Sequence, residues 1–263
     1  IMIFCVLSLI LIWPLARHLG SGFNGKIGPV LFAAGLLMTL VVMFGRGFDA
    51  RHPRGEALFY AIDADQQQAF WVSPDARPGS WLGQFMGEDA NEANMTRLIP
   101  GYDEEVLFRH TSVPSFEAAT LEITGDRKLE GERELSLHLQ SPAAAEYLNL
   151  LFPGDAGISS VTVNGFPVPL PMAEDDGVSQ KADAMKEKDK ARDRDWWRWR
   201  WLGLPLEGAD IVLRLKADRP LAVKIVEVDY GMPEGAPQRP GNSMPKIYTW
   251  SDSTVIFQTL ELD

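Results

Sequence analysis

Residues 195–201 form the stretch whose side chains could most readily support binding chemistry. Their sequence is Asp-Trp-Trp-Arg-Trp-Arg-Trp. Because side chains alternate between the two faces of a strand, the run divides into two sets: Trp197, Trp199 and Trp201 on one face, and Trp196, Arg198 and Arg200 on the other. One interpretation is an aromatic platform for a sugar or a peptide, with the arginines adding cation–π contacts. We favour a core strand, with its tryptophans inside and its arginines outside; contact with a membrane interface is a third interpretation.

Residues that catalyse reactions or bind metals form no recognisable motif. The chain has four histidines, His18, His52, His110 and His138. No pair of them has metal-ligand spacing, and the sequence contains no His-Glu-x-x-His motif, nucleophile elbow, P-loop or dinucleotide-binding glycine set. Asp63 and Asp65 are close in sequence, but in a polar segment such a pair more often stabilises a turn than transfers protons. We therefore expect no catalytic residue, metal ligand or cofactor in this chain.

The overall composition restricts the kinds of partner. The chain has 263 residues, a formal net charge of −11 and an isoelectric point near 4.9. Such an acidic balance disfavours binding to nucleic acid and to anionic lipid surfaces. The single cysteine, Cys5, cannot form an intramolecular disulfide or a thiolate zinc site.

Residues 56–263 have the pattern of an antiparallel β-sandwich. Short runs of strand-forming residues are separated by glycine, proline and polar turns. Residues 133–140 alternate cleanly, with Leu135, Leu137 and Leu139 on one face. Asn164-Gly165, between two such runs, predicts a tight hairpin. The densely charged residues 181–195 are expected to form a solvated insertion in this domain, with a docking site as the alternative.

Two apolar segments precede this domain. Residues 1–16 and 27–45 carry no charged side chain. As a helix the second segment would rise roughly 28 Å, close to the hydrocarbon thickness of a bilayer. Turn residues at 17–26 indicate a two-helix transmembrane hairpin, with 46–55 as a juxtamembrane linker and the lipid bilayer as a partner. Because no basic residue precedes the first segment, we expect it to be the remainder of a helix that begins upstream, in a longer protein.

Four motifs carry a resemblance to a known family. They are Leu58-Phe-Tyr-Ala-Ile-Asp-Ala-Asp, Ala69-Phe-Trp-Val-Ser with the following Trp81 and Gln84-Phe, Ser160-Val-Thr-Val-Asn-Gly, and Asp252-Ser-Thr-Val-Ile-Phe. They resemble the region that follows the last transmembrane helix in membrane-bound M28-family zinc peptidases, the bacterial relatives of the endoplasmic reticulum metallopeptidase. With the apolar segments, the resemblance covers nearly the whole chain, and its motifs are structural rather than catalytic.

In that family a zinc-dependent aminopeptidase domain precedes several membrane helices and a β-rich C-terminal domain. The resemblance therefore implies that this chain holds the last two helices and the C-terminal domain, which would be periplasmic, or lumenal in a eukaryote. Zinc and its ligands would belong to the upstream catalytic domain of the same protein, which is the expected partner. No residue here matches those ligands, so the resemblance implies that this chain alone is inactive.

Three hypotheses about function follow. The first is a non-catalytic membrane anchor and accessory domain of an M28-like zinc aminopeptidase. The alternative is a membrane-anchored module that binds a glycan or a peptide through the Trp-rich strand at 196–201. The third is a structural subunit of an envelope complex. All three assume an all-β soluble domain, an antiparallel β-sandwich at 56–263, preceded by the two-helix transmembrane hairpin at 1–45.

Overall fold

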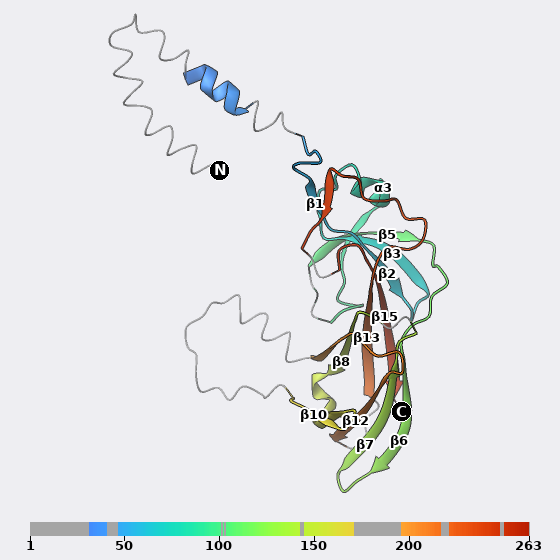
Figure 1. Cartoon of the computed structure of the whole chain (residues 1–263). Coiled ribbons are helices and arrows are strands. Elements are labelled where there is room, and N and C mark those ends of the chain that lie inside the picture. The colour runs from blue at the N-terminus through green and yellow to red at the C-terminus, as the bar shows by residue number, and fades with distance from the viewer. Residues whose placement is uncertain are drawn as a thin grey trace, which may run out of the picture. The chain divides into compact units, whose positions relative to one another are not determined.

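The computed structural model describes residues 32–40, 47–100, 102, 104–142, 145–170, 196–216, 221–247 and 250–262. The chain divides into two compact units, residues 1–53 and residues 54–263. The second unit is built mainly of β-strands (Figure 1). The charged insertion predicted at 181–195 lies outside the described residues.

The first unit contains the apolar segments for which we predicted a transmembrane hairpin. Its residues 32–40 form a helix with exposed side chains. Among the described residues, no helix combines the length and the apolar character that crossing a membrane requires.

The prediction of a two-helix transmembrane hairpin at 1–16 and 27–45 is therefore corrected. The predicted integral membrane localisation depends on that hairpin and is corrected with it, together with the periplasmic or lumenal side that the resemblance implied. The physical reason is that an apolar run indicates only a preference for burial, whereas spanning also needs a continuous helix of about 20 residues. Residues 1–31 and 41–46 lie outside the described residues.

The described residues of the second unit form sheets of eight, five and two strands. Across the eight-stranded sheet the order is β11 (Trp196–Leu202), β8 (Tyr147–Pro153), β13 (Leu221–Tyr230), β15 (Ser253–Leu262), β2 (Phe59–Asp63), β3 (Gln68–Ser73), β5 (Glu105–Thr111) and β4 (Asn91–Asn94). The five-stranded sheet runs β10 (Phe166–Val168), β9 (Ile158–Val163), β12 (Ala209–Lys216), β7 (Glu132–Gln140) and β6 (Thr120–Lys128). The small sheet pairs β1 (Arg54–Glu56) with β14 (Ser243–Pro245).

The five-stranded sheet is antiparallel, but the eight-stranded sheet is mixed and the small sheet is parallel, which corrects the prediction of a purely antiparallel sandwich. β15 pairs with β2 in the parallel direction, with Thr254 opposite Tyr60, and β1 pairs with β14 in parallel. Each parallel pair joins segments far apart in the sequence. Local alternation specifies which face of a strand is buried, but not which distant strand lies beside it or in which direction.

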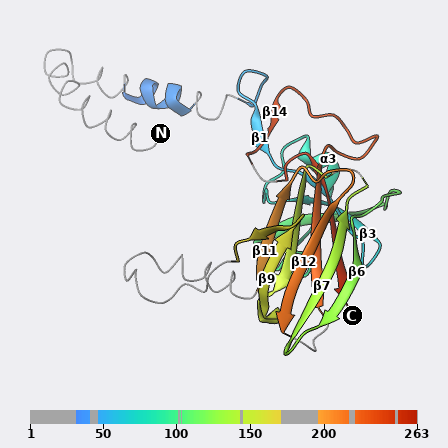
Figure 2. The same ribbon diagram turned by 60° about the horizontal axis from the view of Figure 1, so that its bottom comes forward.

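The five-stranded sheet packs against part of the eight-stranded sheet, and the largest apolar cluster lies between them. Figure 2 shows β9, β12, β7 and β6 side by side in one layer. In β7 the side chains of Leu135, Leu137 and Leu139 are fully buried, while the alternate residues are not. Leu213 of β12 and Val223 of β13 join them in the cluster. Since each such side chain contributes about 1.5–3 kcal/mol on burial, this alternation is the main determinant of the layer contact.

The opposite face of the eight-stranded sheet carries a second cluster. Val226 and Val228 belong to it, whereas Ile225 belongs to the cluster between the sheets, so β13 has one apolar set on each face. Ile99, from the loop after β4, and Trp250 complete the second cluster. This face, where that loop meets β8 and β11, holds the candidate site described below.

Two short elements complete the unit. The helix α3 (Leu82–Met86) buries Leu82, Phe85 and Met86, and the 3-10 helix η1 (Gly154–Ala156) follows β8. The predicted hairpin at Asn164-Gly165 is confirmed, because β9 and β10 pair across it. Both turn residues have positive φ, 47° and 81°, as a tight hairpin turn of this kind requires.

Candidate functional site

The Trp-rich run is strand β11, at one edge of the eight-stranded sheet. It pairs with β8 along its whole length, from Trp196 opposite Pro153 to Leu202 opposite Tyr147. Its alternation separates the six predicted residues into the two expected sets. The sequence therefore predicted which residues share a face, and the fold decides what each face meets.

The three tryptophans at 197, 199 and 201 pack against the cluster between the sheets. Each is partly buried. Trp197 stacks on Phe152, with ring centroids 5.0 Å apart and ring planes at 27°, and Phe152 itself is fully buried. The centroids of Trp199 and Trp201 are 5.2 Å apart. These rings thus cover the core from the sheet edge, while their partial exposure leaves the binding-platform hypothesis a prediction.

Arg198 and Arg200 point to the other face and line a pocket that encloses about 130 Å³. Aromatic and polar walls come from Tyr102, Tyr147, Asn149 and Trp250, and Leu151 and Val226 supply apolar surface. No carboxylate is among the described residues that line it. The structure therefore groups two cations with aromatic rings. In the sequence, the only indication of this site was the alternation Arg-Trp-Arg at residues 198–200.

Arg200 is held in place by two contacts. Its Nε donates a hydrogen bond to Oδ1 of Asn149 at 3.4 Å, and its guanidinium carbon lies 4.7 Å from the centroid of the Tyr147 ring. Asn149 is only 3% exposed, so its orientation is fixed by packing. Arg198 is exposed and makes no hydrogen bond or ion pair within the described ranges.

The far wall of the pocket is an aromatic stack. The rings of Tyr102 and Trp250 lie nearly parallel, 6.1 Å apart between centroids and at 28°. Trp250 is 7% exposed and also contacts Phe59 edge-on. Its buried indole Nε1 finds no hydrogen-bond partner within the described part of the chain. The stack gives the pocket a flat wall, contributed by residues that no sequence pattern had singled out.

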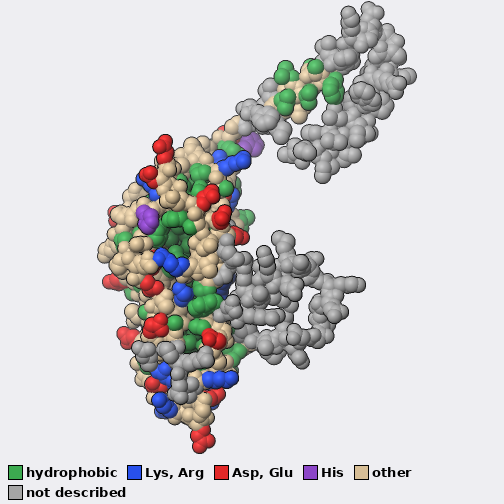
Figure 3. Space-filling model, turned by 180° about the vertical axis from the view of Figure 1, so that it is seen from behind, with side chains coloured by type: hydrophobic (Ala, Val, Ile, Leu, Met, Phe, Trp, Pro, Cys, Tyr) green, Lys and Arg blue, Asp and Glu red, His purple; other side chains and the backbone are tan. Residues whose placement is uncertain are grey.

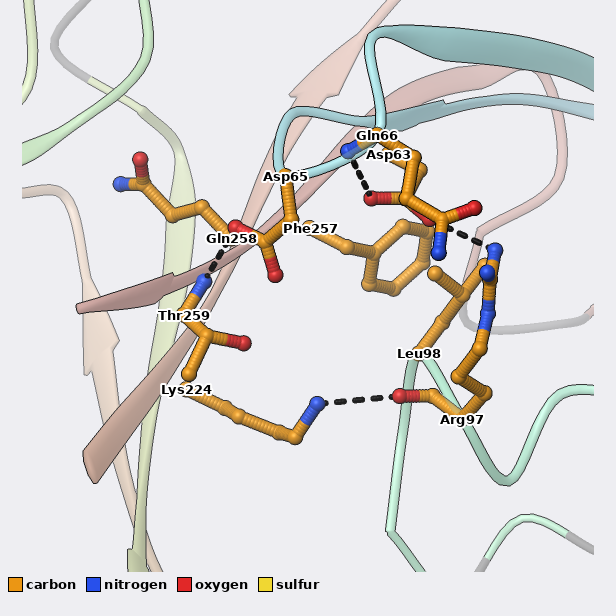
Figure 4. A pocket seen from close by; sticks show the side chains of 9 residues that line it. All are labelled: Asp63, Asp65, Gln66, Arg97, Leu98, Lys224, Phe257, Gln258 and Thr259. Atoms are coloured by element: carbon orange, nitrogen blue, oxygen red, sulfur yellow. Dashed lines mark hydrogen bonds and ion pairs between the residues drawn. The ribbon is translucent and has the colours of Figure 1, made fainter. Parts of the chain in front are cut away.

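A second, smaller pocket contains the aspartates that the sequence analysis considered for acid–base chemistry (Figure 4). It encloses about 80 Å³. The buried carboxylate of Asp63 accepts hydrogen bonds from the Gln66 backbone at 3.0 Å and from Nη2 of Arg97 at 2.7 Å. Asp65 accepts one from the Thr259 backbone at 2.9 Å. Both carboxylates thus fix the β2–β3 turn and its neighbours, which fits the structural role that the sequence favoured.

A deeply buried carboxyl, Glu227, is one that the sequence analysis did not select. Glu227 is 1% exposed, and burial raises the pKa of its carboxyl above the usual value. It accepts hydrogen bonds from the Ala119 backbone and the Ser141 hydroxyl. No substrate can reach a group so enclosed, so its role is structural. The sequence did contain an indication of this role. Glu227 continues the alternation of Leu221, Val223 and Ile225, whose side chains share one buried face of the strand.

Two other polar groupings are less enclosed. Burial, followed by the charge of Glu146, raises the pKa of the Asp229 carboxyl, but neither residue lines either pocket. On β7, Nδ1 of His138 lies 2.8 Å from Oδ1 of Asp210. Within the described residues, no three His, Cys, Asp or Glu side chains are placed to hold a metal ion. The pocket of Arg198 and Arg200 is therefore the strongest candidate for a site.

Comparison with models of known protein families found no match, and neither did a search of curated proteins. The resemblance to M28-family peptidases stays a prediction that rests on its motifs. The predictions of an upstream catalytic partner, of zinc in that partner and of no nucleic-acid binding stay predictions as well.

Proposed function

We propose that the β-rich unit is a non-catalytic binding module that holds a carboxylate-bearing ligand against Arg198 and Arg200. The observation that supports this most directly is the pairing of two exposed guanidinium groups with no carboxylate among the described residues that line their pocket. On the face in Figure 3, Lys and Arg side chains lie among apolar side chains and among Asp and Glu side chains.

The chemistry of the pocket suits such a ligand. A guanidinium group is planar, keeps its charge at all physiological pH values and can bind a carboxylate through two parallel hydrogen bonds. Residues two apart on a strand lie about 6.6 Å from each other, so Arg198 and Arg200 can engage two neighbouring anionic groups. The rings of Tyr102 and Trp250 offer a flat apolar surface next to them.

The volume of the pocket indicates how much of a ligand it holds. Sites that enclose a drug-sized molecule measure about 300–1,000 Å³. A pocket of about 130 Å³ accommodates one acidic group with the carbon atoms that carry it. The rest of the ligand would lie along the surface, which fits recognition of part of a polymer better than an enclosed reaction site.

The test is a binding titration with two carboxylated polymers, poly-glutamate peptide and polygalacturonate. We expect the intact chain to bind at least one of them, and the double variant Arg198→Glu/Arg200→Glu to lose that binding. Lys128→Glu, on strand β6 of the other sheet, changes one exposed charge in the same direction and serves as the control. Equal binding by the arginine variant and the control would overturn the proposal.

A second proposal keeps the accessory role beside a zinc aminopeptidase that the resemblance implies. Two of the quoted motifs, 58–65 and 252–257, lie next to each other as the parallel strands β2 and β15 at the centre of the large sheet. The resemblance thus concerns a contiguous structural unit. It predicts chelator-sensitive aminopeptidase activity in the complete gene product and none in this chain, and a complete gene product without zinc-ligand residues would exclude it.

A further inference from the structure

Strand β11 offers a backbone edge beside the two arginines. It is the outermost strand of the eight-stranded sheet, and within the described residues only β8 pairs with it. Such an edge carries unpaired N–H and C=O groups that can pair with another extended chain. A pocket that holds anionic groups therefore lies next to a row of backbone hydrogen-bonding groups.

The direction of those groups follows from one hydrogen bond just beyond β11. The Gly203 N–H donates to the Glu146 C=O at 3.0 Å, so the backbone at Gly203 faces β8. In an antiparallel pair, this direction alternates from residue to residue. The backbones of Trp197, Trp199 and Trp201 consequently face β8 as well, and those of Arg198 and Arg200 face the outer edge.

The same two residues thus present both their side chains and their backbone groups to an incoming ligand. We propose that the ligand is an extended acidic peptide, which adds to the outer edge of β11 as an antiparallel strand. In that arrangement the peptide residues opposite Arg198 and Arg200 are hydrogen-bonded partners, with side chains on the same face of the sheet. Acidic residues at alternate positions of the peptide then meet the two guanidinium groups. This inference rests on the proposed function.

A peptide fits this edge better than a glycan because it satisfies both features at once. Strand addition derives its affinity from main-chain hydrogen bonds and its specificity from alternate side chains. A carboxylated glycan could use the arginines but would leave the backbone groups of the edge without matching partners. The edge arginines also discourage pairing with basic strands, since like charges that are crowded together repel each other.

The experiment compares acetylated peptides by fluorescence anisotropy with the intact chain. The first is Thr-Val-Glu-Val-Glu-Val-Thr, with glutamates at alternate positions, and the second is Thr-Val-Val-Glu-Glu-Val-Thr, with the same composition and adjacent glutamates. We expect the alternating peptide to bind about tenfold more tightly, because only it can direct both carboxylates to one face.

Backbone methylation then tests strand addition without altering the protein. N-methylation at the two glutamates blocks the amides that should donate to Arg198 and Arg200, and is expected to abolish binding. The amides of the valines that follow them would point away from β11. N-methylation at these valines should therefore keep the affinity within about twofold of that of the unmethylated peptide. Because the protein is unchanged, this comparison does not depend on the folding of a variant.

Reversal of the charges supplies the matching test on the protein side. The double variant Arg198→Glu/Arg200→Glu should bind the acidic peptide about tenfold more weakly than the parent chain does. It should bind the analogue with lysine in place of glutamate more tightly than the parent chain does. Circular dichroism and thermal melting check that the variant is folded, and Arg198→Glu alone serves if the double variant is not.

The outcomes distinguish strand addition from the anionic pocket itself. If both methylated peptides bind equally well while the arginines remain necessary, strand addition is wrong and the anionic pocket stands. Binding of polygalacturonate but of no acidic peptide would likewise exclude strand addition and keep the pocket. If no carboxylated probe binds at all, the pocket and the strand addition are both wrong.

Discussion

At the scale of single residues, Glu227 shows how one buried acid connects the two main sheets. It lies on β13, and its carboxylate accepts a hydrogen bond from the Ala119 backbone at 2.8 Å and another from the Ser141 hydroxyl. Ala119 immediately precedes β6, and Ser141 immediately follows β7. The Ser141 oxygen accepts a further bond from the Ala145 backbone at 3.1 Å. The side chain thus fixes the entry and the exit of one hairpin against the other sheet.

Burial of this carboxyl predicts a dependence of stability on pH. Its pKa is raised in the folded state, so the unfolded chain ionises first as the pH rises above about 4.5. Ionisation in the unfolded state favours unfolding, so the stability contributed by the protonated group is present below that pH and is lost as the pH rises through the folded pKa. Urea titrations between pH 4 and pH 8 should therefore show a smaller decline for Glu227→Gln than for the parent chain.

Glu130→Gln, in the exposed turn between β6 and β7, is the control for that measurement. It should follow the pH profile of the parent chain. An unchanged profile for Glu227→Gln, equal to that of the control, would falsify the assignment of this dependence to the buried carboxyl.

At the scale of elements, the two faces of β11 meet different surroundings. Trp197, Trp199 and Trp201 cover the core between the sheets, and the two arginines line the pocket. The same alternation that places Trp197 over Phe152 places Arg198 on the opposite side. Substitutions at neighbouring positions should therefore change stability and the proposed ligand binding separately.

Trp197→Ala is expected to destabilise the unit by about 3 kcal/mol, since it removes a partly buried ring stacked on a core phenylalanine. Arg198→Ala, one residue later, should change stability by less than about 0.5 kcal/mol because its side chain is exposed. Chemical denaturation of both variants measures the difference. A stable Trp197→Ala variant that has lost ligand binding would instead favour the aromatic platform.

At the scale of the whole β-rich unit, the last strand is the element on which the large sheet depends. β15 lies between β13 and β2 and pairs with both, in antiparallel and parallel directions respectively. β2 begins at Phe59, so the pair joins the two ends of the unit. Contacts between such distant segments close long loops, which makes folding slow and dependent on the complete chain.

A chain truncated after Trp250 should consequently fail to fold, because β13 and β2 each lose a central partner. Loss of dispersed amide signals in a two-dimensional NMR spectrum would report this. Addition of the synthetic segment 251–262 should restore part of the dispersion, since the missing strand carries the required apolar side chains Val255, Ile256 and Phe257. A well-dispersed spectrum of the truncated chain would show that β15 is dispensable.

The elements that could be predicted are those specified by neighbouring residues. The alternation in residues 133–140 gave β7 and its buried leucines, and Asn164-Gly165 gave the hairpin of β9 and β10. The predicted transmembrane hairpin is wrong, because apolar composition alone does not specify a spanning helix. The hydrogen bonds of Glu227 could not be predicted, because only the packing of the two sheets brings its partners Ala119 and Ser141 next to it.

By itself, the sequence determined the two faces of β11, since alternation along a strand is a property of the backbone. It thereby determined that Arg198 and Arg200 share one face, opposite to that of Trp197, Trp199 and Trp201. Only the tertiary structure decided that β8, Tyr102 and Trp250 surround those arginines, and that β11 lies at a sheet edge. The physical reason is that strand order and the approach of distant loops depend on the mutual burial of apolar faces, which no local pattern encodes.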